Sequence, residues 1–326
     1  MTRPYLFIVL PLLSALPLGC GSVEDRSPAS QVVVFHAGSL SVPFLEIAEA
    51  FEREYPGVRV IREAAGSRTC ARKITDLNRR CDVFASADYA VIDELLFPDY
   101  ADWSILFAGN ELCLAYHSQS LGAGELTDAN WIDTLLTPAV HYARSDPDSD
   151  PCGYRTVQAF QLAEQHYARS GSAQSLLSKD LRFIRPKGSD LIALLETRSV
   201  DYAFIYRSVA EQHGIDYLRL PDEVNLSDSD LAELYATAVA TVSGREPGDT
   251  SNIRATPMRY GVTIPKNAPN PSGAEAFVSF LLHPDHGLAI LRKHHQTLTK
   301  PTVRGAFAQV PVGLQARIAE EPVPAS

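Results

Sequence analysis

Residues 32–58 read VVVFHAGSLSVPFLEIAEAFEREYPGV, and this stretch contains one complete strand–turn–helix unit. The apolar run 31–36 predicts a strand, which stops at Ala37-Gly38-Ser39. The apolar residues that follow recur at helical spacing with glutamates between them, and Pro56-Gly57 ends the predicted helix. A strand followed directly by an amphipathic helix is the building unit of parallel α/β sheets.

The same unit then repeats along the chain. Residues 58–62 predict a second strand, Ala65-Gly66-Ser67 a turn, and residues 68–80 a helix. A third strand is expected at 82–86, followed by a helix at 89–96. Strands that alternate with helices in this way favour a parallel sheet covered by helices on both faces.

The remainder of the chain predicts a second lobe of the same class. Residues 111–117 are expected to cross into it, and residues 261–265 to return. We therefore expect an α/β protein with two lobes joined by two crossover strands. Residues 31–108 plus 266–318 form the first lobe, and residues 109–265 form the second. In such sheets, ligands bind beyond the carboxyl ends of the strands, at helix N-termini in the cleft.

The first thirty residues are interpreted as a leader and a tether. Arg3 is followed by the apolar run 5–18 and by Gly19-Cys20, so residues 1–20 predict a secretory signal. The Leu-Gly-Cys ending resembles a lipoprotein processing box, which would attach a membrane lipid to Cys20. Ordinary signal cleavage near the same place is the alternative. Residues 21–30 are a polar tether, and the mature protein is expected to be periplasmic or displayed on the cell surface.

Composition limits the classes of partner. The formal net charge of −10 argues against nucleic acid, whose phosphates need clustered Lys and Arg. An anionic ligand is compatible with that charge only if local backbone dipoles hold it. Four cysteines follow Cys20, at spacings that match no zinc or redox motif, and they are interpreted as small packing residues.

Three turns share one chemistry: Ala37-Gly38-Ser39, Ala65-Gly66-Ser67 and Pro151-Cys152-Gly153 each precede a predicted helix. A helix start exposes unpaired N–H groups and carries about half a positive charge. Glycine lets the backbone approach a ligand closely, and a serine hydroxyl adds a neutral donor. Three such turns facing one cleft would bind a compact anion; the alternative is that each turn only caps its helix.

Five stretches of this sequence resemble one known family most clearly, and the resemblance covers most of residues 31–302. They are 32–58, quoted above, REAAGSRTCARKITDL (62–77), DVFASADYAVIDELLFPDYADW (82–103), SDPDSDPCGYR (145–155) and DYAFIYRSVAEQHG (201–214). They are similar to the molybdate/tungstate-binding proteins of ABC transporters, and most of all to the archaeal tungstate-uptake branch. The resemblance implies a type II periplasmic-binding-protein fold that closes like a hinge on its ligand, with no cofactor.

The resemblance also implies a set of ligand residues. The two ligand serines of the family correspond to Ser39 and Ser67, and its Pro-x-Gly donor corresponds to the backbone N–H of Cys152. The tyrosine hydroxyl corresponds to Tyr206 at the end of FIY. The archaeal branch places two carboxylates by the metal of the oxyanion, and the first corresponds to Asp150.

The second carboxylate of that branch is missing, because counting back from Tyr206 puts Gly188 at its position. Gly188 is instead expected to donate its backbone N–H, as the bacterial branch does there. Asp150 then contacts the metal alone, binds through water, or accepts the proton of hydrogen phosphate. Phosphate and sulfate therefore stay open as alternative ligands. A supporting contact from Arg155 to Asp150 is one interpretation of the first helical turn.

The expected activity is binding without catalysis. No serine has a convincing His and Asp partner set, and no phosphate loop of the NTPase type occurs. A monomer that hands its oxyanion to an ABC permease and ATPase is expected. An enzyme that uses Asp150 as a general base, or a sensor subunit on the same fold, are the alternatives.

Overall fold

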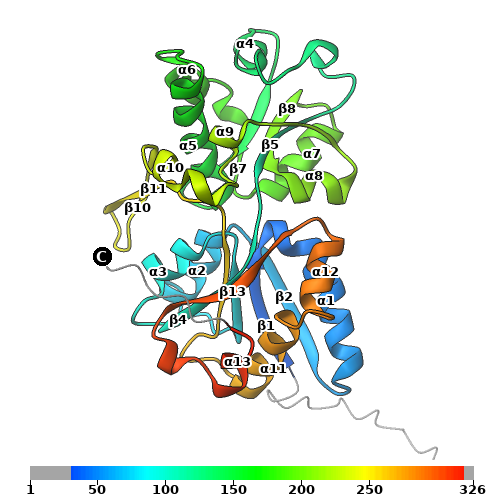
Figure 1. The fold of residues 1–326 in the computed structure, drawn as a ribbon, viewed down its shortest axis with the longest axis vertical. Helices are drawn as coiled ribbons and strands as arrows, with labels where there is room; N and C mark the ends of the chain where they lie inside the picture. The colour runs from blue at the N-terminus through cyan, green and yellow to red at the C-terminus, as the bar shows by residue number, and fades with distance from the viewer. Residues whose placement is uncertain (1–30, 319–326) are drawn as a thin grey trace, which may run out of the picture.

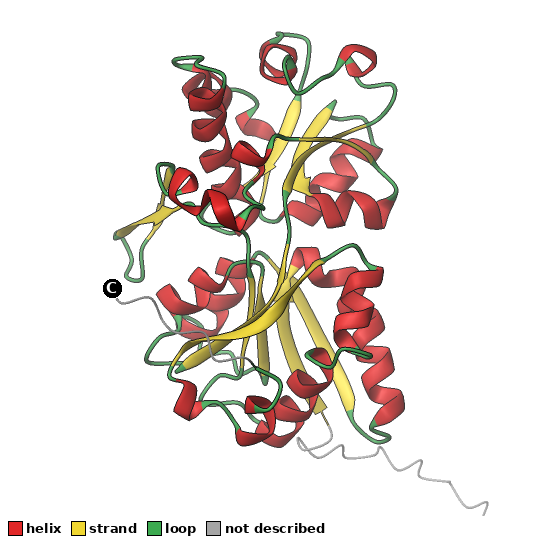
Figure 2. Ribbon diagram, in the orientation of Figure 1, coloured by secondary structure: helices red, strands yellow, loops and turns green. Residues whose placement is uncertain are grey.

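The computed structural model describes residues 31–318, which form two lobes, each built on one β-sheet with helices packed against it (Figures 1 and 2). The predicted signal, Cys20 and the tether lie outside the described residues. Among residues 31–318, no helix has both the length and the apolar character needed to cross a bilayer.

The first lobe contains a six-stranded sheet in the order β13-β4-β12-β3-β1-β2. Strands β1, β2 and β3 are parallel, whereas β12 and β13 run antiparallel to their neighbours. The strands are β1 (Gln31–Ala37), β2 (Arg59–Ala65), β3 (Val83–Ser86), β4 (Trp103–Gly109), β12 (Tyr260–Thr263) and β13 (Thr297–Gly305). The helices are α1 (Ser41–Glu54), α2 (Ser67–Thr75), α3 (Tyr89–Leu95), α11 (Pro271–Leu281), α12 (Gly287–Lys293) and α13 (Val312–Gln315).

The second lobe contains a five-stranded sheet in the order β7-β6-β8-β5-β9 and a separate hairpin, β10–β11. The strands are β5 (Leu112–Tyr116), β6 (Tyr142–Ser145), β7 (Ile184–Arg185), β8 (Tyr202–Tyr206), β9 (Asp216–Arg219), β10 (Val239–Ser243) and β11 (Thr250–Arg254). The helices are α4 (Trp131–Leu136), α5 (Pro151–His166), α6 (Ser172–Ser178), α7 (Leu191–Glu196), α8 (Arg207–His213), α9 (Asp222–Asn225) and α10 (Ala232–Tyr235).

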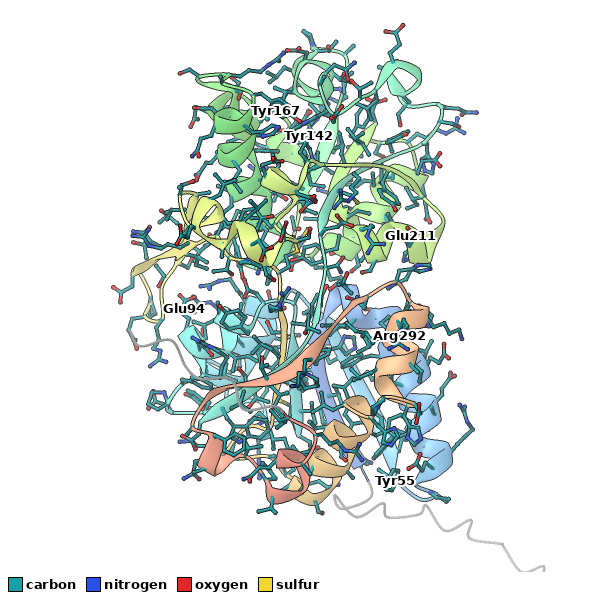
Figure 3. All side chains as sticks on the ribbon, viewed as in Figure 1. Tyr55, Glu94, Tyr142, Tyr167, Glu211 and Arg292 are labelled. Atoms are coloured by element: carbon teal, nitrogen blue, oxygen red, sulfur yellow. The ribbon has the colours of Figure 1, made fainter. Side chains whose placement is uncertain are left out.

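Each lobe has a core of interlocking aromatic side chains. In the first lobe, Phe51 packs edge-on against Phe277 and Phe280, which ties α1 to α11. In the second lobe, Trp131 and Tyr142 both pack against Phe204 of the central strand β8, and Figure 3 labels Tyr142 near the top of this lobe. Such ring pairs add to the burial energy of the residues that form them, and they stabilise the core of each lobe.

The structure differs from the sequence-based expectations in several places. Strand β12 pairs with β3 and β4, so the return to the first lobe comes before Tyr260 rather than after residue 265. Helix α2 ends at Thr75, because Asn78 takes a left-handed conformation with φ of 50°. The four cysteines among residues 31–318 are buried and form no disulfide with one another.

Candidate ligand-binding site

A small cavity lies where the two lobes meet. The first lobe contributes Ser39, which follows β1. The second lobe contributes the remaining lining residues, which are Asp150, Cys152, Gly188, Ser189, Ile205, Tyr206 and Val209. The structure thus brings five of the six residues expected from the sequence to one small cavity, and Ser67 is the one that does not line it.

Two glycines allow the lobes to approach each other at this cavity. A Cβ atom on Gly38 would lie 2.8 Å from the Ser189 Oγ of the second lobe. A Cβ atom on Gly66 would lie 2.2 Å from the backbone oxygen of Ser149, which is closer than any side chain permits. The N–H of Thr69 donates to that same oxygen across the interface, at 3.2 Å. At Gly66 the backbone of the first lobe therefore meets the backbone of the second, whereas at Gly38 it meets the side chain of Ser189.

The hydroxyl of Ser39 is held in a buried hydrogen-bond chain. Its Oγ lies 2.9 Å from the hydroxyl of Tyr260, which also accepts a hydrogen bond from Asn110 Nδ2 at 3.1 Å. Because Asn110 supplies a proton to Tyr260, the phenol can donate its own proton to Ser39. Ser39 can then direct its O–H into the cavity as a donor. Ser39 lies in the 3-10 turn 38–40, which leads directly into α1.

Ser67 is the first residue of α2 and is fully buried. Its Oγ accepts a hydrogen bond from the N–H of Ala87 at 3.0 Å, so the O–H proton remains available to a further acceptor. The following turn of α2 contacts the segment before Asp150 through the Thr69–Ser149 hydrogen bond. Ser67 thus lies beside the interface between the lobes, outside the cavity lining.

Asp150 is the N-cap of α5 and is 6% exposed. Its Oδ2 accepts the N–H of Gly188 at 2.6 Å, and its Oδ1 accepts the N–H of Cys152 at 3.4 Å. Burial raises the pKa of this carboxyl to about 6, and the two N–H donors oppose that rise. The carboxylate therefore occupies the two backbone donors that the sequence assigned to a bound anion.

Tyr206 ends β8 on the second-lobe side of the cavity. Its hydroxyl is buried and has no hydrogen-bond partner among residues 31–318. Burial raises the pKa of this phenol well above its ordinary value, so the group keeps its proton. A buried hydroxyl without a partner costs free energy unless something accepts its hydrogen bond, and an oxygen-rich ligand in the cavity would do so.

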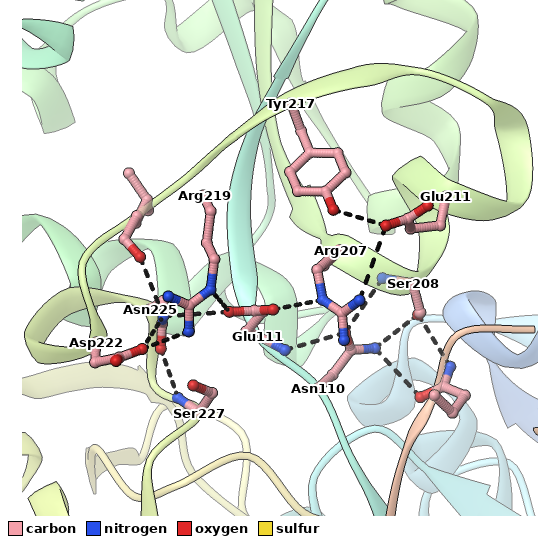
Figure 4. Close-up of polar contacts among 12 residues, drawn as sticks. Asn110, Glu111, Arg207, Ser208, Glu211, Tyr217, Arg219, Asp222, Asn225 and Ser227 are labelled. Carbon is pink, nitrogen blue, oxygen red and sulfur yellow. Dashed lines mark hydrogen bonds and ion pairs between the residues drawn. The ribbon is translucent and has the colours of Figure 1, made fainter. Parts of the chain in front are cut away.

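Sequence reasoning missed the polar network at the hinge (Figure 4). Asn110, between β4 and β5, donates to Ser208, to Tyr260 and to Gln296 at 2.7, 3.1 and 3.3 Å. Beside it, the Glu111 carboxylate pairs with two arginines, Arg207 and Arg219. Single polar residues in short connections carry no periodic signal, so the sequence could not show that they converge.

The sequence and the fold were compared with known proteins. The family model described as bacterial extracellular solute-binding protein matches residues 32–295. An uncharacterized solute-binding protein of Petrotoga mobilis is 47% identical over 286 residues, covering 87% of this chain and 89% of its own length. The molybdate/tungstate-binding protein WtpA of Pyrococcus abyssi is 39% identical over 322 residues, covering 90% and 91%.

The periplasmic molybdate-binding protein of Azotobacter vinelandii superimposes with a TM-score of 0.57, at 16% identity, over 82% of this chain and 99% of its own. At that identity the likeness concerns the fold alone. The fold is the type II periplasmic-binding-protein fold that was expected from the sequence.

Proposed function

The chain belongs to the bacterial extracellular solute-binding proteins, and we propose that it captures molybdate or tungstate between its lobes for uptake through an ABC transporter. The name of the Pyrococcus abyssi relative and the residues lining the cavity both support this ligand class. The observation that carries the proposal is the buried Tyr206 hydroxyl, a donor beside a small cavity that finds no acceptor among residues 31–318.

The ligand would be held by neutral donors from both lobes. Ser39 offers an O–H from the first lobe, and Tyr206 offers one from the second. Ser67 is proposed to join them, because its Oγ already accepts from Ala87 and its proton is free to be donated. Hydrogen bonds to a charged group contribute about 1.5–3 kcal/mol each, so three hydroxyls and one or two N–H groups suffice for tight binding after association costs.

Asp150 decides which oxyanion fits best. A carboxylate beside a dianion is repulsive unless it contacts a positively polarised centre. The metal of molybdate or tungstate can accept an additional oxygen ligand, which the sulfur of sulfate does not do. We propose that Asp150 contacts the metal, while Gly188 and Cys152 turn their N–H groups to the oxygens of the ligand. With glycine at 188, only one carboxylate is available for such a contact.

Hydrogen phosphate is the second candidate, because the Asp150 carboxylate lines the cavity and can accept a ligand proton. Calorimetric titration of the purified chain with molybdate, tungstate, sulfate and phosphate separates the candidates. Stoichiometric binding of the two metal oxyanions, at least 100-fold tighter than sulfate or phosphate, is expected. Tight phosphate binding without binding of the metal oxyanions would replace the proposed ligand.

Binding without catalysis is proposed, and it accounts for the relatives being described as solute-binding proteins. Turnover of a small substrate by the purified chain would instead make Asp150 a general base. Export, a lipid anchor on Cys20, a monomeric state, and delivery to a permease and its ATPase remain parts of the same proposal. Metabolic labelling with a radioactive fatty acid, compared between the unaltered chain and Cys20→Ser, tests the anchor.

A further inference from the structure

One fully buried ion pair joins the two lobes away from the cavity lining. Asp88 follows β3 in the first lobe and caps α3, whereas Arg155 is the fifth residue of α5 in the second lobe. Arg155 Nη2 donates to Asp88 Oδ2 at 2.6 Å, and the two side chains are 1% and 2% exposed. The contact to Asp150 that the sequence allowed for Arg155 is replaced by this pair.

Each partner is anchored within its own lobe. Asp88 Oδ1 accepts the N–H of Ala90 at 3.0 Å, which fixes the carboxylate to α3. Arg155 is anchored because helix α5 packs on the second-lobe strands β6 and β8. The Tyr154 hydroxyl of the same helix also donates to Asp88 Oδ2 at 2.7 Å, which is a second contact between the lobes. Arg155 Nη1 donates to the oxygen of Thr256, in the segment that leads back to the first lobe, at 3.0 Å. A hinge rotation that separates the lobes therefore moves the two charges apart.

The pair is close in the chain to the proposed ligand donors. Arg155 comes three residues after Cys152 on the same helix, so fixing its guanidinium fixes the helix start that carries Asp150. A second arginine contact between the lobes runs from the first lobe to the second. Arg68, directly after Ser67, is fully buried and donates to the oxygen of Ser243 in the second-lobe hairpin at 2.5 Å. Both helices that carry proposed donors are thus bound to the opposite lobe by an arginine.

We propose that Arg155 is a positioning residue for ligand retention, acting through its buried pair with Asp88 to hold the lobes closed around the cavity. This inference rests on the proposed function. In the closed arrangement each charge is compensated by the other, and neither reaches water. Removing one partner leaves an uncompensated buried charge, which only opening of the lobes can hydrate. Removing both leaves no such charge.

The test compares Asp88→Asn, Arg155→Gln and the double variant with the unaltered chain. Asn at 88 keeps an acceptor for the cap of α3. The matched control is Arg304→Gln, because Arg304 pairs with Asp93 of the same helix α3 at 3.1 Å, but within the first lobe and partly exposed. Sodium molybdate affinity is measured by calorimetry, its dissociation rate by stopped flow, and lobe separation by small-angle X-ray scattering with and without molybdate.

Each single variant is expected to bind molybdate about 100-fold more weakly, mainly through faster dissociation, and to show a larger radius of gyration. The double variant should regain at least tenfold of the affinity, which damage to the fold alone would not produce. Arg304→Gln should stay within threefold of the unaltered chain.

The proposal is overturned if both single variants keep the affinity and radius of gyration of the unaltered chain while only their melting temperatures fall. Unaltered protein that binds no metal oxyanion would sink the proposed function alone. Small-angle scattering without ligand then still decides the inference, because each single variant must open further than both the unaltered chain and the double variant.

Discussion

The two sides of the cavity are built from opposite kinds of group. The first lobe presents the neutral hydroxyl of Ser39, which is already bonded to Tyr260. Ser67, outside the cavity lining, is a second neutral hydroxyl of this lobe and already accepts the N–H of Ala87. The second lobe presents a buried carboxylate, Asp150, which occupies the N–H groups of Cys152 and Gly188. The first side is organised for any compact acceptor, whereas the second must rearrange for a ligand. Selectivity should therefore reside in the second lobe.

The largest effect is expected from Asp150→Ala. Tungstate affinity should fall about 100-fold, or about 2.7 kcal/mol, because the contact to the metal is lost. Sulfate affinity should rise at least threefold, because a repulsive charge is removed from beside the dianion. Calorimetric titration with both anions measures the two changes. If the tungstate and sulfate affinities moved in the same direction, Asp150 would not discriminate between the two anions. Selectivity would then not reside in the second lobe.

Because the first-lobe side of the cavity is built from neutral groups, the free energy of unfolding should fall when acid protonates a histidine beside it. Burial lowers the pKa of His36, which directly precedes the first turn, from 6.5 to about 4, against an opposing hydrogen bond with the Ala37 oxygen. A lowered pKa in the folded state means that the unfolded chain binds the proton more readily. The stability that His36 contributes is therefore present above pH 6.5 and is lost as the pH falls from there toward 4.

Between pH 7.5 and pH 5, this single group should cost about 2 kcal/mol of unfolding free energy. Urea unfolding of the unaltered chain and of His36→Gln across this range measures the difference in slope, which removes the contribution of other titrating groups. Identical slopes in the two proteins would show that His36 charges equally well in the folded state.

A third comparison separates the two serines. Ser39→Ala should weaken molybdate binding about tenfold, or about 1.4 kcal/mol, with little change in stability. Ser67→Ala also leaves the buried N–H of Ala87 without its acceptor, so the free energy of unfolding should fall by about 1–2 kcal/mol as well. Calorimetry and urea unfolding on both variants provide the readouts. Equal losses of unfolding free energy in the two variants would mean that the hydrogen bond from Ala87 to Ser67 does not stabilise the fold.

The smallest effect is expected from Gly188→Ala. A Cβ atom there would lie 3.4 Å from Cys152 Sγ and 3.6 Å from Asp150 Oδ2, which are tolerable contacts. Stability should change by less than about 0.5 kcal/mol, and molybdate affinity should change less than threefold, because only the backbone N–H of residue 188 is proposed to act. A large loss of affinity measured by calorimetry would show that the second-lobe side has no room to rearrange.

The repeating strand–helix units were predictable because their apolar residues recur with a clear period. Strand β1 and helix α1 lie within a residue or two of the predicted ranges. Strands β4 and β13 were not predicted, and neither was the hairpin β10–β11, whose second strand alternates exposed with half-buried residues. The edge strand β13 and the hairpin are specified by what they pair with, and a single sequence does not contain that information. Strand β4 is an interior strand buried along its whole length, and this reason does not apply to it.

The site shows the same division. Turn chemistry and family resemblance selected Ser39, Asp150, Cys152, Gly188 and Tyr206, and all five line one cavity. The partners of these residues could not be predicted. Tyr260, more than 200 residues from Ser39, bonds its hydroxyl, and Arg155 pairs with Asp88 of the other lobe. Such contacts depend on how two separately folded lobes meet, which local pattern does not encode.

The position of Tyr260 has a consequence for protein engineering. Its hydroxyl contacts Ser39 on one side and Asn110 of the first connection on the other, while Tyr260 itself begins the strand that completes the second connection. The same hydrogen-bonded side chains therefore contact the ligand cavity and the connections about which the lobes move. Transferring only the cavity residues to another two-lobed protein would copy the shape of the pocket but not its coupling to lobe closure. A transferred site must therefore also include residues 110, 208, 260 and 296.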